Sequence, residues 1–279
     1  MIPFTKMQGI GNDYIYVNCL KRELPNPGEL SKKMSDRHYG IGSDGLILVL
    51  PSDTADFRMR MFNSDGSESE MCGNGIRCFS KYVYDRRLVD RPKLSVETAA
   101  GIKYIDLTVE DGKAVSAKVD MGQPRLERNL IPMKGAEGRV INERLSLADG
   151  TAFDITCVSM GNPHTVIYVD DVRNFPVALY GPQIENHALF PSRTNVEFVS
   201  VVSRTEVIQR TWERGAGETF ACGTGASAVC VAGVLTGRTD RSIMSHLLGG
   251  DLKLVWDEAS DHLFMSGAAV EVFEGVWPD

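Results

Sequence analysis

The sequence has no long apolar run, no concentrated basic stretch and few cysteines. No segment is long enough to span a bilayer, and the opening "MIPFTKMQGIGNDY" lacks the uninterrupted apolar stretch of a secretion signal. We therefore expect a cytoplasmic protein. The formal net charge of −7, with Lys and Arg scattered through the chain, disfavours nucleic acid or an anionic membrane as a partner. A small-molecule substrate fits better.

The six cysteines are too sparse in 279 residues for a disulfide scaffold, so most should remain thiols. They also lack the spacing of zinc knuckles, and no His pair follows them, so we expect no metal. Taken alone, each cysteine is interpreted as a small buried residue. We keep that interpretation for Cys19, Cys78, Cys157 and Cys230.

The chain contains an internal repeat. "MCGNGIRC" at 71–78 resembles "ACGTGASAVC" at 221–230, and Cys222 follows Cys72 by 150 positions. The same offset relates Gly11-Asn12 to Gly161-Asn162 and also holds for single Arg, Glu and Lys matches. Two copies of one supersecondary unit explain a fixed offset over some ninety residues.

Short β-rich runs surround one helical stretch in each half. Several alternate apolar with polar residues, which is typical of half-buried antiparallel strands. The predicted strands are 46–50, 57–62, 102–109, 114–120, 153–160, 164–169, 195–202, 206–212, 251–256 and 269–273. The predicted helices, about 74–88 and 224–236, follow the two repeated cysteines, and the second has no polar face and should be buried all round.

This pattern predicts an α+β fold of two pseudo-symmetric domains, each a mostly antiparallel sheet wrapped around a central helix. We expect the linker at "DMGQPR", residues 120–125, which carries Gly and Pro. We expect one lobe from residues 1–121 plus 269–279, carrying Cys72, and a second from 122–268, carrying Cys222. The active site should lie in the cleft between them.

The repeated context gives Cys72 and Cys222 a functional interpretation. A thiol just before a glycine-rich helix start lies beside free N–H groups, which stabilise a thiolate or a bound carboxylate. Two such thiols on opposite faces of one carbon can act as base and acid, as inversion of a stereocentre requires. Helix N-termini could hold the substrate carboxylate as it gains enediolate character.

Six ordered motifs then resemble the diaminopimelate epimerase family over almost the whole chain. They are "GIGNDYIYVN", "RHYGIGSDG", "FNSDGSESEMCGNGIRC", "GNPH", "TNVEFV" and "WERGAGETFACGTGASA". The resemblance implies a cofactor-independent epimerase of lysine and peptidoglycan precursor synthesis, which interconverts L,L- and meso-diaminopimelate. It also implies the family's two-domain fold, and relatives are often homodimers.

The resemblance assigns Cys72 and Cys222 as the acid/base thiols, with His164 and Glu213 beside the reacting centre. It implies that Gly73, Asn74, Gly223 and Thr224 offer backbone donors to the reacting carboxylate. The remaining substrate contacts implied are Asn12, Asn63, Asn162, Asn195 and Arg214, the last against the distal carboxylate. The chain departs from the pattern at Gly45, where some members carry a glutamine that touches substrate.

Other functions remain open at this point. A related cofactor-independent racemase could act on histidine, proline or hydroxyproline, although Asn74 stands where proline racemases place a His. From a different class, Gly223-Thr224-Gly225 with Ala228 loosely matches a nucleotide-binding G-x-G-x-x-A motif, but its setting is not a βαβ unit. A Cys72–Cys222 disulfide switch is a third possibility.

Overall fold

The computed structural model describes residues 1–278, which form two compact units. The first unit comprises Met1–Asp120 and the chain from Ser266 onward, and the second comprises Met121–Met265. The chain passes from one unit to the other within two strands, β8 (Lys113–Gly122) and β17 (Leu263–Ala268). The first part of the predicted linker, 120–122, therefore completes β8, because Met121 continues the buried alternation set by Val119.

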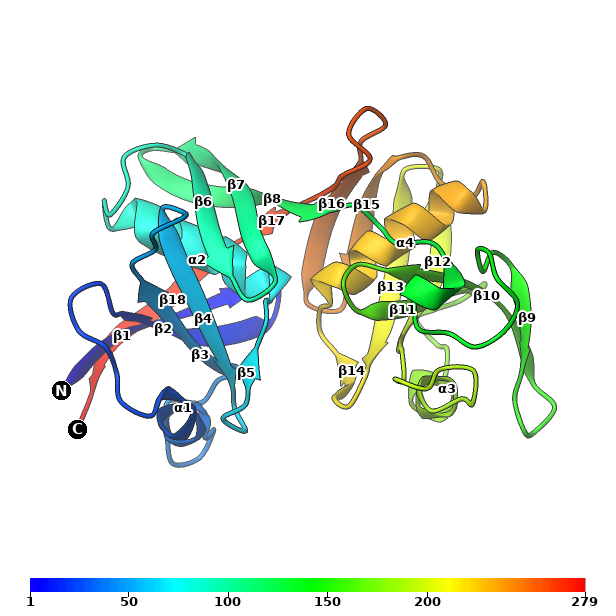
Figure 1. The fold of residues 1–279 in the computed structure, drawn as a ribbon, viewed down its shortest axis with the longest axis horizontal. Helices are drawn as coiled ribbons and strands as arrows, with labels where there is room; N and C mark the ends of the chain where they lie inside the picture. The colour runs from blue at the N-terminus through cyan, green and yellow to red at the C-terminus, as the bar shows by residue number, and fades with distance from the viewer. Residues whose placement is uncertain (279) are drawn as a thin grey trace. The chain divides into compact units, whose positions relative to one another are not determined.

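The first unit begins with a strand hairpin and ends with the last strand of the chain (Figure 1). Its other elements are β1 (Ile2–Gly9), β2 (Asn12–Asn18), α1 (Pro27–Ser35), β3 (Gly45–Leu50), β4 (Phe57–Asn63), β5 (Glu68–Ser69), α2 (Gly73–Asp85), β6 (Lys93–Thr98), β7 (Gly101–Glu110) and β18 (Val270–Trp277).

The second unit has the same order of elements around its central helix, with β9 pairing with β10 as β18 pairs with β1, and it adds one short 3₁₀ helix. Its elements are η1 (Arg128–Leu130), β9 (Glu143–Ser146), β10 (Ala152–Ser159), β11 (Pro163–Tyr168), α3 (Val177–Glu185), β12 (Asn195–Ser203), β13 (Glu206–Glu213), β14 (Gly217–Thr219), α4 (Gly223–Leu235), β15 (Ser242–Leu247) and β16 (Gly250–Trp256).

Strand pairing is mostly antiparallel in both units, as predicted. Hairpins join β1 to β2, β6 to β7 and β7 to β8, and correspondingly β10 to β11 and β15 to β16. Each unit also has two parallel pairs, β2–β3 and β4–β6 in the first and β11–β12 and β13–β15 in the second. A helix lies within each parallel crossover, which is the usual way to connect parallel strands.

The repeat extends through the whole of both units. The helices α1 and α3 are related by the 150-residue offset from end to end, and so are α2 and α4. The prediction of a pseudo-symmetric α+β fold is confirmed, although α1 and α3 were not predicted. These two are short, and their faces are only partly apolar.

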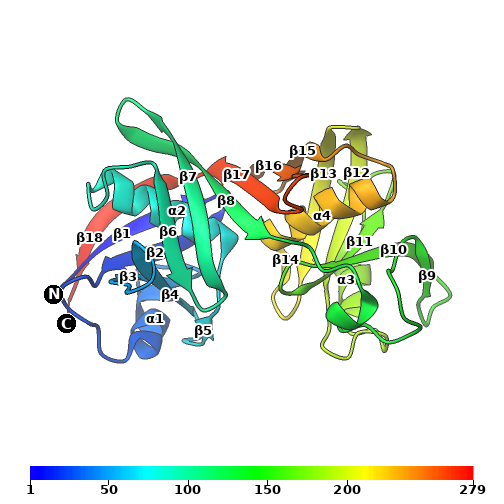
Figure 2. The same ribbon diagram turned by 45° about the horizontal axis from the view of Figure 1, so that its top comes forward.

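One helix lies at the centre of each unit, with strands packed around it (Figures 1 and 2). Helix α2 contacts β1, β2, β3 and β7, and α4 contacts β10, β11, β12, β15 and β16. The outer sides of the sheets are covered by α1 on β3 and β4 and by α3 on β12, β13 and β14. Side chains of β3 alternate between these two layers, since successive strand residues point to opposite faces.

The central helices end in the same way. The N–H of Leu88 donates to the Val83 carbonyl at 2.9 Å, and that of Arg238 donates to the Gly233 carbonyl at 2.8 Å. Each bond spans a left-handed residue, Arg87 or Gly237, which terminates the helix in a Schellman motif. The helices therefore stop at Asp85 and Leu235, slightly before the predicted ends. Among the described residues, no helix is long and apolar enough to cross a membrane.

Candidate active site

The two repeated cysteines occupy the same position, the N-cap of a central helix. Cys72 precedes α2 with φ −130° and ψ 122°, and Cys222 precedes α4 with φ −125° and ψ 108°. Each sulfur accepts a hydrogen bond from a backbone N–H three residues on, Gly75 or Gly225, at 3.4 Å. A thiol here takes the place of the hydroxyl or carboxylate that usually caps a helix, and it lies in the positive field of the helix N-terminus.

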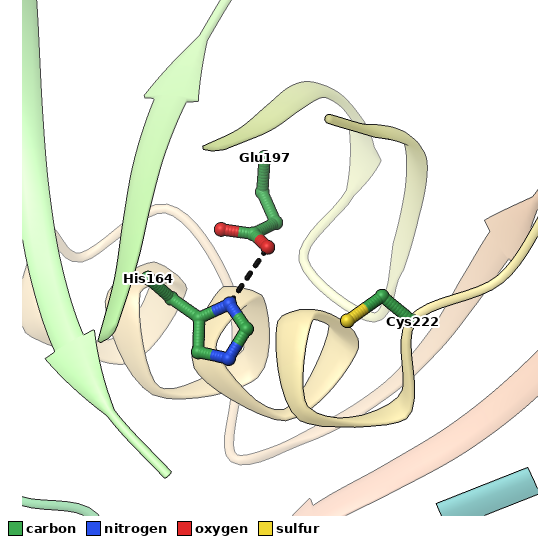
Figure 3. Close-up of side chains that lie close together, drawn as sticks. All are labelled: His164, Glu197 and Cys222. Atoms are coloured by element: carbon green, nitrogen blue, oxygen red, sulfur yellow. Dashed lines mark hydrogen bonds and ion pairs between the residues drawn. The ribbon is translucent and has the colours of Figure 1, made fainter. Parts of the chain in front are cut away.

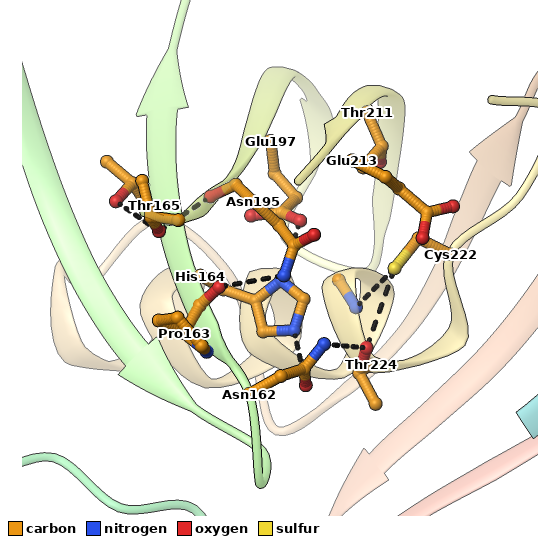
Figure 4. Close-up of polar contacts among 12 residues, drawn as sticks. Asn162, Pro163, His164, Thr165, Asn195, Glu197, Thr211, Glu213, Cys222 and Thr224 are labelled. Atoms are coloured by element: carbon orange, nitrogen blue, oxygen red, sulfur yellow. Dashed lines mark hydrogen bonds and ion pairs between the residues drawn. The ribbon is translucent and has the colours of Figure 1, made fainter. Parts of the chain in front are cut away.

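In the second unit, the C-terminal ends of β13 and the N-terminal ends of β11 and β12 bring polar side chains to the start of α4 (Figure 4). The amide nitrogen of Asn162 donates to the Thr224 hydroxyl at 3.3 Å, and Thr224 Oγ1 lies 3.5 Å from the Cys222 sulfur. The Asn162 oxygen lies 3.0 Å from Nε2 of His164. These predicted residues therefore form one connected cluster.

His164 is completely buried and is held from behind by a second buried residue, Glu197 (Figure 3). Nδ1 of His164 lies 2.8 Å from Oε1 of Glu197, and both side chains have no exposed surface. Sequence reasoning missed Glu197. The available signal was a carboxylate within "NVEFVSVV", a strand whose neighbouring positions are apolar and buried.

Glu213 lies at the end of β13 and faces the Cys222 thiol. The Thr219 hydroxyl donates to its Oε1 at 2.5 Å, and burial raises the pKa of the Glu213 carboxyl. Burial also raises the pKa of Cys222 well above its usual range, and the charges of Glu213 and Glu197 add to this effect. Negative charge next to a buried sulfur disfavours the thiolate, so this site favours a protonated Cys222.

Asn195 and Arg214 lie beside this cluster. Asn195 is buried, and its amide donates to the Pro163 carbonyl at 2.9 Å while its oxygen accepts from the Arg214 backbone N–H at 2.9 Å. The Arg214 guanidinium donates to the Ser192 carbonyl at 2.9 Å and is otherwise exposed. Asn195 therefore fixes the backbone from which Arg214 extends.

The first unit repeats this arrangement around Cys72 with different chemistry. The Tyr14 hydroxyl donates to the Cys72 sulfur at 3.4 Å. Asn74 donates through its amide to Asn12, whose own amide donates to Oδ2 of Asp44 at 3.2 Å. The Asn74–Asn12 pair is the counterpart of Thr224–Asn162 at the 150-residue offset. Tyr14, which sequence reasoning missed, is the counterpart of His164 and could have been found by that offset.

Asn63 ends β4 at the position that Glu213 has on β13. Its amide donates to the Ser67 hydroxyl at 2.9 Å. Gly73 and Gly223 are the first residues of α2 and α4, so their N–H groups belong to the helix starts beside the thiols.

The departure at Gly45 has a structural reason. A Cβ at this position would lie 2.2 Å from the Phe62 carbonyl oxygen on the neighbouring strand. The close approach of β3 and β4 at this point requires glycine, so a longer side chain would demand a backbone shift.

The two units thus differ in the charge that surrounds equivalent thiols. Tyr14 and Ile47 of the first unit correspond to His164 and Glu197 of the second, and Asn63 corresponds to Glu213. The fully buried Arg77, on α2, corresponds to Ser227. Its guanidinium donates to the Asn74 oxygen at 2.9 Å. Carboxylates therefore gather around Cys222, whereas a cation and a phenol lie near Cys72.

His164, Glu197 and Cys222 are also the described residues whose donor atoms gather as a potential metal-binding group, within 4.8 Å of one another. One nitrogen, one oxygen and one sulfur would suit zinc. Two of the three donors, however, are joined by the 2.8 Å hydrogen bond between the imidazole and the carboxylate. The prediction that the protein uses no metal remains a prediction.

Comparisons with known proteins agree on one family. The family model described as "Diaminopimelate epimerase" matches residues 4–127 and 156–272. A protein of Acetivibrio thermocellus with that name is 57% identical over 272 residues, covering 98% of this chain and 97% of its own. A Methanococcus maripaludis protein of the same name is 55% identical, covering 98% of this chain and 99% of its own.

Solved structures with lower identity share the fold. A Bacillus anthracis phenazine biosynthesis protein aligns with a TM-score of 0.69 at 19% identity, covering 98% of each chain. A probable proline racemase from Agrobacterium radiobacter aligns with a TM-score of 0.71 at 13% identity, covering 100% of this chain and 93% of its own. At these identities the likeness concerns the fold alone.

The environments of the two thiols predict unequal reactivity. At pH 7, iodoacetamide should label Cys72 in the native protein well before Cys222. The thiolate is the reactive form of cysteine, and the pKa of Cys222 is raised above the usual cysteine value of about 9, so Cys222 stays protonated at this pH. Peptide mass spectrometry over time measures both rates. Cys78, whose pKa burial raises to about 11, is an internal control that should stay unlabelled. Equal labelling of Cys72 and Cys222 would contradict the prediction.

Proposed function

Because the chain belongs to the diaminopimelate epimerase family, we propose that it interconverts L,L- and meso-diaminopimelate by proton transfer at one α carbon, without a cofactor. The observation that carries the proposal is the repeated thiol at the N-cap of a buried helix. Two equivalent one-proton groups are what inversion of a carbon centre needs. Full-length identity above one half to relatives of that name supports the choice of substrate.

In the proposed reaction, one substrate molecule is shared by the two units, with Cys72 at one face of its α carbon and Cys222 at the other. One cysteine, as thiolate, takes the α proton. The electron pair of the broken C–H bond moves into the adjacent carboxylate, which gains enediolate character. The other cysteine, as thiol, then gives its proton to the opposite face, so the enzyme ends with the two protonation states exchanged.

The helix starts supply the stabilisation that this intermediate needs. We assign the backbone N–H groups of Gly73, Asn74, Gly223 and Thr224 to the reacting carboxylate. These donors carry partial positive charge and are fixed before the charge develops, which is the condition for effective transition-state stabilisation. The side-chain pairs Asn74–Asn12 and Thr224–Asn162 brace both helix starts.

The second unit supplies the residues that set the protonation state of the Cys222 thiol. We assign His164 and Glu213 to the reacting centre beside Cys222, where Glu213 maintains the thiol form of the cysteine between turnovers. Asn12, Asn63, Asn162 and Asn195 are assigned to substrate binding, since amides both donate to carboxylates and accept from ammonium groups. Arg214 is assigned to the distal carboxylate of the substrate.

We also propose that the protein acts in the cytoplasm as a homodimer. Five of its six cysteines are buried, a use of cysteine typical of reducing compartments. Strand β18 pairs with β1 and carries four apolar side chains that are each about half exposed, Val270, Val272, Phe273 and Val276. An exposed apolar strand of this kind is a common site of self-association.

Deuterium exchange tests the two-thiol scheme. In D₂O, the protein should exchange the α proton of L,L-diaminopimelate as it forms the meso isomer, and should leave L-histidine unchanged; NMR follows both. Cys72→Ser and Cys222→Ser should each lower epimerisation by at least about a hundredfold, because each removes one of the two proton-transfer groups. Epimerisation at the wild-type rate by either variant would rule out the scheme.

Arg214→Ala tests the distal clamp. The variant should raise KM for diaminopimelate by about tenfold or more, because a charged hydrogen bond to the distal carboxylate is lost. Binding of a monocarboxylate amino acid, measured by competition, should change little. Equal losses for both ligands would contradict the assignment.

Val272→Glu tests the proposed dimer face. Sedimentation velocity should show a dimer for the wild type and a monomer for this variant, since paired strands would bury like charges from both subunits. Val202→Glu, at a similarly exposed valine of the second unit, is the matched control and should remain dimeric. A monomeric wild type would end the dimer proposal.

A further inference from the structure

We infer that Glu197 is a positioning residue, which clamps the His164 ring against the start of α4 and keeps Cys222 in its proton-donating thiol form. The inference rests on the proposed function and extends it to a residue that lies behind the reacting groups. Four independent features of the structure support it: burial, packing, connection to the cysteine and charge.

Burial gives the first argument. Glu197 lies in the middle of β12 with no exposed surface, and its Oε1 bonds the His164 ring nitrogen at 2.8 Å. Oε2 is also buried and has no hydrogen-bond partner among the described residues. A buried carboxylate with one partner is unfavourable for folding alone, because polar groups removed from water normally have all their bonds replaced. Its presence at this cost to folding points to a role in function.

Packing gives the second argument. A Cβ on Gly225 would lie 2.5 Å from Oε1 of Glu197 and 3.2 Å from the Cys222 sulfur. Gly225 is helical, so its backbone does not itself require glycine. The missing side chain leaves space for the carboxylate beside the thiol. In the first unit the counterpart Gly75 faces the methyl group of Ile47 instead, so only the second unit has built a carboxylate into this space.

A chain of contacts also connects Glu197 to the cysteine (Figures 3 and 4). Because Oε1 holds Nδ1 of His164, the ring is fixed and presents Nε2 to the Asn162 oxygen at 3.0 Å. The Asn162 amide in turn donates to Thr224, which contacts the Cys222 sulfur. Loss of the carboxylate would release the ring and, with it, the amide that orients Thr224.

The charge of Glu197 also acts on the Cys222 thiol. Glu197 on β12 and Glu213 on β13 both face Cys222, with His164 on β11 and the Cys157 thiol on β10 as the other titratable groups packed around the cluster. The donor atoms of Glu197 and Cys222 lie within 4.8 Å. At that distance and in a buried setting, a negative carboxylate opposes ionisation of the thiol.

Glu197→Gln is the main test, because it keeps the shape and an acceptor for Nδ1 but removes the charge. We expect kcat/KM to fall about 10- to 100-fold, because a neutral amide oxygen holds the His164 ring less firmly than a carboxylate and the catalytic groups are then less well placed. The fall should be equal for the L,L and meso substrates, since the equilibrium between them is fixed. Glu127→Gln, at a half-exposed carboxylate paired with Arg139 away from this cluster, is the matched control and should retain wild-type kcat/KM.

A second readout needs no substrate. In a Cys72→Ser background, the rate of Cys222 alkylation is measured against pH with and without Glu197→Gln. The midpoint should move down by at least about one pH unit when the charge is removed. This arm reports on Glu197 even if the wild type fails to epimerise diaminopimelate, so failure of the proposed function and failure of this inference are distinguishable.

A double-mutant cycle separates positioning from a structural role. If Glu197 acts through His164, then Glu197→Gln should cost little further kcat/KM in a His164→Gln background. Additive losses together with an unmoved alkylation midpoint would overturn the inference, as would full activity of Glu197→Gln. Should thermal unfolding show that Glu197→Gln does not fold, Gly225→Ala replaces it: its new Cβ displaces the carboxylate, and the midpoint must again move down.

Discussion

The interaction on which this protein depends is a hydrogen bond from a helical N–H to a cysteine sulfur, made once in each unit. It fixes the thiol at the positive end of a buried helix, where the free backbone N–H groups stabilise an anion. The bond requires an extended cysteine, a helix that starts at once, and glycines that leave the backbone accessible. The sheet around each helix then excludes water from the remaining sides.

Duplication of this unit explains how two matched thiols arise, but matched thiols alone would be a poor acid–base pair. One must hold a proton while the other lacks it. The two units differ in side chain at equivalent positions around the thiols. Tyr14, Ile47 and Arg77 of the first unit correspond to His164, Glu197 and Ser227 of the second. The same backbone therefore places a cation and a phenol near the Cys72 sulfur and two carboxylates near the Cys222 sulfur. The two thiols have the same geometry but different electrostatic surroundings.

The sequence was sufficient to predict the parts of the fold and of the site that are repeated or periodic in the chain. The 150-residue offset located both thiols and both central helices, and alternation located most strands. It was insufficient for α1 and α3, for the short strands β5, β9 and β14, and for the longer strands β1, β2, β6, β15 and β17, whose apolar patterns are brief or interrupted. Glu197 shows why a single sequence does not predict contacts between distant residues. Alternation marks its position as buried, but its partner His164 lies 33 residues away and comes within hydrogen-bond distance only through the parallel pairing of β11 with β12.

That pairing also explains why the buried charge occurs at this place in the fold. Residues at strand ends can be polar because loops and helix starts satisfy them, as with Asn162, Asn195 and Glu213. Residues inside β12 contact only the side chains of neighbouring strands, of α4 on one face and of α3 on the other. A carboxylate there is tolerated because His164 projects from the adjacent strand toward the same side and Gly225 leaves room on the helix. The polar pair therefore reaches the thiol from within the core, where solvent does not weaken its charge.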